Sequence, residues 1–165
     1  MVHIIVIMAT GLYVGMLPIA PGLWGSALAL LLWSVCRKLA LSIYVGITVG
    51  LFFLGLLVAE HAETIFARQD AGPIVIDEVL GIFITLTPAS KLRLGWLYGF
   101  LLFIILDGLK PFPASWIDTH LHGGWGIMLD DVIAGIYASL ILYTAISFVS
   151  KKNKLINRNC KQAEN

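Results

Sequence analysis

Acidic side chains stand at the ends of apolar segments in this sequence, where they could take part in chemistry. The richest stretch is 103–135, in which an apolar run meets a break rich in proline and glycine and a second apolar run follows. The ionisable groups of this stretch include Asp107, Lys110, His120, His122, Asp130 and Asp131. A second acidic pair, Asp77 and Glu78, opens another apolar segment. Because a charge at the edge of a membrane-depth segment is costly to desolvate, these positions indicate a functional site.

The acidic residues offer the ligands that a hard cation prefers. They are Asp77, Glu78, Asp107, Asp130 and Asp131, and no cysteine accompanies them. Neighbouring carboxylates repel each other, which favours either a bound cation or a raised pKa. Asp130 and Asp131 are each followed four residues later by a small residue, Ala134 and Gly135, which leaves room for an ion or ligand. Carboxylates with room for water suit magnesium, held by one or two of them together with a substrate phosphate.

Basic and glycine-rich positions beside these acids suit a phosphate. Lys110 is a positive donor, and glycine-rich backbone such as that at Gly123 and Gly124 can offer N–H groups to phosphate oxygens. A metal together with a phosphate at a membrane surface predicts phosphoryl chemistry on a lipid. The metal would polarise the phosphoryl group and orient or generate a hydroxide, or one carboxylate would act as general base for a water. The sequence leaves open which carboxylate that is, and how many metal ions bind.

The composition places the chain in a membrane. It has 165 residues, 59% of them hydrophobic, and a mean hydropathy of +0.90, which a soluble domain of this size does not reach. The net charge of +1 and the lack of a basic stripe with aromatic residues argue against nucleic-acid binding. Two cysteines without metal-binding spacing give no disulfide framework or zinc site, and no phosphate-binding GxxxxGK[ST] loop supports an ATP-driven reaction. No feature indicates an oligomeric state.

The elements that must position the acids are apolar helices. We expect them at about 2–17, 23–36, 39–59, 77–88, 94–106 and 127–149, with the helix at 39–59 running on beyond the membrane into the polar stretch 60–72. The run 39–59 is long enough for a hydrocarbon core of about 30 Å, whereas several others are short enough for re-entrant paths. The fold class predicted is therefore all-α: a polytopic membrane helical bundle with short or re-entrant segments and one polar active-site face. Residues 1–149 form its membrane-embedded domain, and residues 150–165 form a basic, flexible C-terminal tail.

Alternating these helices across the membrane brings the acids together. The segments Pro18–Ser26, Glu60–Glu78, Asp107–Lys110 and His120–Asp131 all fall on one side, and Arg37, Lys38, Lys91, Arg93, the basic tail and both termini fall on the other. The segment Pro18–Ser26 is either a tight turn or a backbone wall of the polar site, with Ser26 opening the next helix. The positive-inside rule favours the basic side as cytoplasmic. The orientation of the site stays open.

Four blocks of this sequence resemble one family. They are PIAPGLWGS at 18–26, IVIDEVLGIFIT at 74–85, LDGLKPFP at 106–113 and HGGWGIMLDDVIAG at 122–135. The chain is similar over most of residues 10–145 to phosphatidylglycerophosphatase A, a bacterial membrane lipid phosphatase. The resemblance implies magnesium-dependent removal of the terminal phosphate from phosphatidylglycerol phosphate, in a multi-pass protein of the bacterial cytoplasmic (inner) membrane.

The resemblance also implies roles for single residues. The metal-binding and catalytic acids would be the five named above. Lys110 and His122 match phosphate-handling positions, with Ser26, Gly123 and Gly124 as further substrate-binding residues. One position departs from the family, which usually carries an arginine three residues before the first acid of the DxxKP block, where this chain has Ile104. Loss of that arginine removes a bidentate phosphate contact that a lysine does not reproduce.

Two other classes of protein remain as alternatives. A small ion- or proton-coupled transporter would use the acids as an intramembrane relay, but its halves should show an internal repeat, and none is visible. A helical packing protein would explain the GxxxG pairs, such as Gly46 and Gly50. It would leave the acids unexplained.

Overall fold

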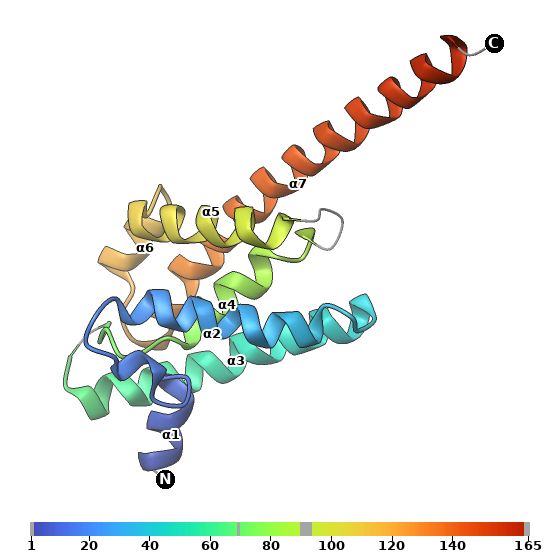
Figure 1. The fold of residues 1–165 in the computed structure, drawn as a ribbon. Coiled ribbons are helices and arrows are strands. Elements are labelled where there is room, and N and C mark those ends of the chain that lie inside the picture. The colour runs from blue at the N-terminus through green and yellow to red at the C-terminus, as the bar shows by residue number, and fades with distance from the viewer. Residues whose placement is uncertain (1, 69, 90–93, 164–165) are drawn as a thin grey trace.

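In the described residues, every regular element of secondary structure is a helix. The structure is a computed structural model that describes residues 2–68, 70–89 and 94–163, with side chains as far as residue 151. Its elements, in order, are α1 (Val2–Ala9), the 3-10 helix η1 (Val14–Met16), α2 (Pro21–Cys36), α3 (Leu41–Phe66), α4 (Ile76–Thr85), α5 (Gly95–Leu109), α6 (Ala114–His120) and α7 (Gly123–Ala163). Figure 1 shows them as a bundle from which the end of α7 projects. The predicted all-α membrane bundle is confirmed.

Among the described residues, two helices are long and apolar enough to cross a membrane. They are α3 and the part of α7 from Gly123 to Lys151, and a third span exists if α5 and α6, which meet at 49°, are counted as one broken span. The helix α2 is apolar but shorter. The prediction of short segments beside full spans therefore agrees with the structure.

The short helix α4 is the centre of the bundle. It contacts α2, α3, α5 and α7, and nearly all its side chains are buried, including that of Asp77. Its ten residues rise about 15 Å, half of a hydrocarbon core of about 30 Å. The helix can lie at membrane depth because protein surrounds it on all sides, so its ends are not exposed to lipid.

Glycines let α4 approach its neighbours closely. A Cβ on Gly135 of α7 would lie 2.8 Å from the carbonyl oxygen of Gly81 in α4, and a Cβ on Gly81 would clash with the ring of Phe103 in α5. The hydroxyl of Thr85 in α4 donates to the carbonyl oxygen of Gly135 at 3.4 Å. Small residues at such a crossing allow the close backbone contact that stabilises helix pairs in membranes.

The ends of two helices differ from the prediction. The first helix, expected over 2–17, ends at Ala9, because the backbone N–H of Val75 donates to the carbonyl oxygen of Ala9 at 2.8 Å and Leu12 and Tyr13 adopt left-handed backbone conformations. The last helix, expected to end near 149, continues to Ala163, since residues 151–163 contain no glycine or proline to stop it. Lys91 and Arg93 of the predicted basic side lie outside the described residues, as do the last two residues of the predicted tail.

Candidate active site

The predicted acidic residues line one cavity. Its volume is about 280 Å³, and its lining residues are Pro21, Gly22, Asp70, Gly72, Ile74, Asp77, Glu78, Asp107, Gly108, Lys110, Asp130 and Asp131. They come from the start of α2, the loop between α3 and α4, the start of α4, the end of α5 and the first turns of α7. The convergence expected from helix alternation is thus present in the structure.

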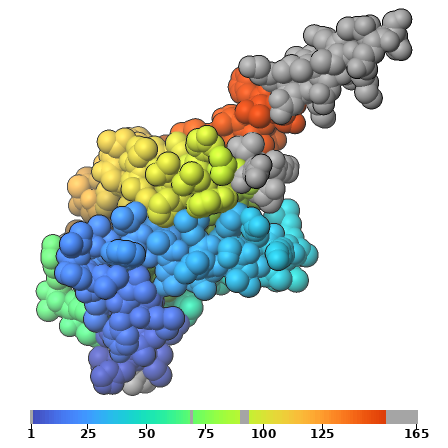
Figure 2. Space-filling view, viewed as in Figure 1, coloured from blue at the N-terminus to red at the C-terminus, as the bar shows by residue number. Residues whose placement is uncertain are grey.

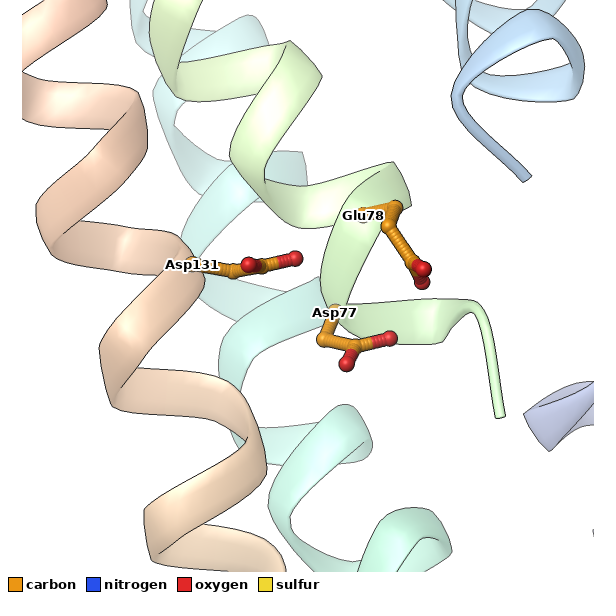
Figure 3. A group of neighbouring side chains, drawn as sticks. All are labelled: Asp77, Glu78 and Asp131. Carbon is orange, nitrogen blue, oxygen red and sulfur yellow. The ribbon is translucent and has the colours of Figure 1, made fainter. Parts of the chain in front are cut away.

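Three carboxylates form the innermost part of this cavity. One oxygen from each of Asp77, Glu78 and Asp131 lies within 4.8 Å of the others, and Figure 3 shows the side chains of Asp77 and Glu78 on α4 with Asp131 on the neighbouring α7. Asp77 Oδ1, Glu78 Oε2 and Asp131 Oδ2 are buried and have no hydrogen-bond partner. Buried polar atoms are nearly always paired, so an unpartnered oxygen on each of three neighbouring carboxylates calls for a ligand.

The glycine crossing explains why these acids meet. Asp77 lies four residues before Gly81 in α4, and Asp131 lies four residues before Gly135 in α7. Residues four apart share a helix face, so each acid lies one turn from the point where the helices touch. The close contact of α4 with α7 therefore holds the two carboxylates beside each other.

The surroundings of the acids on α4 disfavour their charged forms. Burial, together with the neighbouring charge of Glu78, raises the pKa of Asp77 well above its ordinary value. Burial likewise raises the pKa of Glu78 to about 7. A divalent cation reverses this penalty, because it attracts the charges that otherwise repel one another.

The donor set fits such a cation. All three groups are carboxylates, which are hard oxygen ligands, and the described part of the chain places no cysteine or histidine among the cavity's lining residues. The cavity also leaves space for water and for part of a substrate. A magnesium-like ion could be held by Asp77, Glu78 and Asp131.

Gly22 brings the start of α2 against this cluster. A Cβ at Gly22 would lie 2.5 Å from Glu78 Oε1, so a larger residue would displace that carboxylate. The N-cap residue of α2, Ala20, supplies no side-chain cap. The positive end of the α2 dipole therefore acts on Glu78 directly.

Lys110 joins two acids on another side of the cavity. Its ammonium nitrogen Nζ donates to Asp118 Oδ1 at 2.6 Å and to Asp130 Oδ2 at 2.7 Å. Asp130 Oδ1 in turn accepts the backbone N–H of Asp131 at 3.0 Å. Lys110 also ends α5 in a left-handed conformation with φ of 42°, which is unfavourable for a residue with a side chain. The ion pairs thus fix a strained residue at the cavity wall.

The sequence reasoning missed two acids of this site. Asp70 lines the cavity from the loop before Gly72, and Asp118 of α6 holds Lys110. Asp118 lies within the stretch 103–135, eight residues after Lys110. This position was the only sequence signal that could have pointed to it as a site residue. Its pairing depends on the direction of α6.

Four predicted substrate-binding residues lie outside the lining of this cavity. Ser26 is buried in α2, with 1% of its surface exposed. His122 and Gly123 border a separate depression beside Glu63, and the backbone N–H of Gly124 donates to Glu60 Oε2 at 2.7 Å. The substrate-binding roles of all four residues stay predictions.

Comparisons with known proteins identify one family, although one relative, from Bacteroides thetaiotaomicron and 32% identical over 148 residues (85% of this chain and 92% of the relative), is named "Putative phosphatidylinositol-3-phosphatase". The sequence model of the family described as phosphatidylglycerophosphatase A matches residues 7–146. A protein of that name from Escherichia coli is 36% identical over 138 residues, which cover 83% of this chain and 80% of the relative. Another from Haemophilus influenzae is 37% identical over 139 residues, covering 83% and 85%. No solved structure matches.

Proposed function

The chain belongs to the phosphatidylglycerophosphatase A family, and we propose that its acidic cavity binds magnesium and removes the terminal phosphate of phosphatidylglycerol phosphate to give phosphatidylglycerol. It is thus an enzyme of phospholipid biosynthesis, a phosphoric monoester hydrolase. The metal and the roles of single residues are the parts that we add.

One observation carries the proposal for the metal. One carboxylate oxygen from each of Asp77, Glu78 and Asp131 lies within 4.8 Å of the others, and each of these side chains has a buried oxygen without a hydrogen-bond partner. Without a cation this arrangement costs free energy, because it desolvates like charges that do not compensate one another. A divalent cation bound there would supply positive charge to stabilise the phosphoryl oxygens during the reaction.

Lys110 is proposed to bind the phosphate. A lysine ammonium has three N–H donors, and Asp118 and Asp130 accept two of them. The third remains for a phosphate oxygen in the cavity that Lys110 lines. The two carboxylates thereby act as positioning residues, since they hold the ammonium at the cavity wall.

Asp107 is proposed as the general base. It lines the cavity but belongs neither to the three-carboxylate cluster nor to the ion pairs of Lys110. Its carboxylate can therefore accept a proton from water as the water oxygen bonds to phosphorus. The bond from phosphorus to the glycerol oxygen breaks, and that oxygen becomes the alcohol by taking a proton from solvent, to which Asp107 returns the one it accepted.

The transporter alternative has less support. Membership of a phosphatase family already explains why the chain carries an acidic cluster. A transporter should also show an internal repeat, and none is evident among the two or three candidate spans of the described helices. We propose that the protein is a multi-pass protein of the bacterial inner membrane. Its site then lies near one membrane surface, where a lipid headgroup can reach it.

The direct test is phosphate release from phosphatidylglycerol phosphate by the purified protein in detergent. We expect release with magnesium, none in chelator, and recovery when magnesium is restored. The matched control is Asp131→Asn, which keeps the side-chain volume and removes a proposed ligand. Phosphate release that persists in chelator would contradict the proposed metal dependence. No release from the folded wild-type protein would contradict the proposed substrate.

A further inference from the structure

We propose that the acyl chains of the lipid substrate lie along the seam between α2 and α5, with the headgroup in the acidic cavity at its end. The seam is defined by Leu23, Ala27 and Leu30 of α2 and by Leu97, Leu101 and Ile104 of α5. This inference rests on the proposed function. It adds to it the path by which a lipid enters the site.

One face of α5, which runs from the cavity toward the start of the helix, is apolar and partly exposed. Gly108 lines the cavity together with Pro21 and Gly22 of α2, so the side of α5 that carries it reaches the cavity that the start of α2 also lines. Going back along the helix, the same face presents Ile104, Leu101 and Leu97, at four, seven and eleven residues from Gly108. Leu101 is 48% exposed, and the other two are half-buried.

A matching stripe runs along α2. Leu23 comes directly after the cavity-lining Gly22, and Ala27 and Leu30 follow Leu23 at successive spacings of four and three residues, which places the three on one face. The opposite flank of α2 is already occupied, because Leu28 packs toward Gly11 beside η1. The stripe therefore lies on the flank toward α5.

The two helices leave this seam lightly packed. The main partner of α2 is α4 and that of α5 is α7, and α2 and α5 make few contacts with each other. Figure 2 shows them side by side on one open face, with α2 in blue and α5 in yellow-green. Leu23 of α2 and Leu101 of α5 are 45% and 48% exposed, so apolar surface on both helices is available to a lipid.

The size of the seam fits one leaflet. Gly108 and Leu97 are eleven positions apart and thus about 16 Å apart along the helix, close to half of a hydrocarbon core of about 30 Å. The end of the seam at Gly108 adjoins the acidic cavity. The length of the seam matches that of the acyl chains in one leaflet. A lipid with its phosphate in the cavity would thus place its chains between α2 and α5.

The mouth of the seam has room for the glycerol backbone. A Cβ at Gly108 would meet no atom within 4 Å, so this position faces open space within the cavity wall. Its neighbour across the mouth, Gly22, also lacks a side chain. The junction between polar cavity and apolar seam is therefore bounded by two glycines.

The test compares bulky substitutions on and off the seam. Leu101→Trp and, on the other helix, Leu23→Trp would fill it, and the matched control is Leu140→Trp on α7, where the leucine is 57% exposed. The assay measures kcat/KM on long-chain phosphatidylglycerol phosphate in detergent. It also measures inhibition by the deacylated, water-soluble headgroup of that lipid, which reports on the polar cavity alone.

We expect both seam variants to lose at least about tenfold in kcat/KM, with an unchanged inhibition constant for the soluble headgroup, while Leu140→Trp keeps wild-type activity. Equal activity in all variants, an equal loss in the control, or a parallel loss of headgroup binding would overturn the acyl path. A wild-type protein that releases no phosphate would instead contradict the proposed function.

Discussion

Gly81 of α4 and Gly135 of α7 touch through their backbones: a Cβ added at Gly135 would lie 2.8 Å from the carbonyl oxygen of Gly81. Each glycine follows a site acid, Asp77 or Asp131, by four residues. The distance between the two helix axes at this crossing therefore sets the distance between the two carboxylates. A packing contact inside the bundle thus controls the geometry of the site.

Gly135→Ala should therefore lower both stability and activity. The added methyl group has to push apart two backbones, and overpacking of this kind costs about 1–3 kcal/mol. The separation of the helices would also widen the carboxylate cluster and reduce phosphate release. Denaturation in detergent and the phosphate assay measure the two effects.

The control for this substitution is Gly50→Ala in α3. A Cβ at Gly50 meets no atom within 4 Å, and alanine is the better helix former by about 0.5–1 kcal/mol. We expect it to be neutral or slightly stabilising. If Gly135→Ala behaved like Gly50→Ala, the glycine crossing would not be what holds the acids together.

Asp131→Asn should abolish activity while the protein folds at least as well as the wild type. Loss of a direct ligand should reduce activity by about 100-fold or more, since even indirect partners of metal ligands contribute 10–100-fold. In chelator the variant should unfold at a higher temperature, because it removes one of three buried like charges. Full activity would exclude Asp131 from the site.

Magnesium should stabilise the wild type but not Asp131→Asn. A ligand that binds only the folded state at about 100 times its Kd adds about 2.7 kcal/mol to the free energy of unfolding. Thermal unfolding with and without magnesium measures this effect independently of catalysis. An equal stabilisation of both proteins would place the ion elsewhere.

Lys110→Met should reduce activity more than Asp118→Asn. Without its ammonium, the buried Oδ2 of Asp130 loses its ion-pair partner, which costs about 1–3 kcal/mol, and the phosphate loses a donor. Asp118 is more exposed, with 37% of its side-chain surface accessible, and Asp130 still holds the lysine when Asp118 is changed.

The double variant tests whether the two residues act together. If Asp118 works through Lys110, adding Asp118→Asn to Lys110→Met should reduce activity no further. Additive losses would mean that Asp118 has a separate role.

The sequence predicts the convergence of the acids because it depends only on which ends of the helices share a side. It also identifies Gly135 as a small neighbour of Asp131. Its partner Gly81 could not be identified, since the contact depends on how α4 and α7 cross. Crossing geometry follows from side-chain packing over both helices.

Other differences have the same origin in contacts between distant segments. The end of α1 is set by the hydrogen bond from Val75 to Ala9, which local hydropathy does not encode. The role of Asp118 follows from the path of α6 after Pro113, which directs the carboxylate back to Lys110. Local sequence patterns thus predict the elements better than they predict contacts between them.

Ile104→Arg should strengthen substrate binding. Ile104 is half-buried and lies one turn before Gly108, which lines the cavity, so a long side chain at this position could extend its guanidinium to the phosphate. Arginine binds phosphate through two parallel hydrogen bonds and can extend from an apolar surface toward a polar one. We therefore expect a lower KM with kcat the same or higher, and Ile104→Met, which adds length without charge, should bring no gain. A severe loss with arginine but not with methionine would show that the cavity margin in this protein has repacked around an apolar residue.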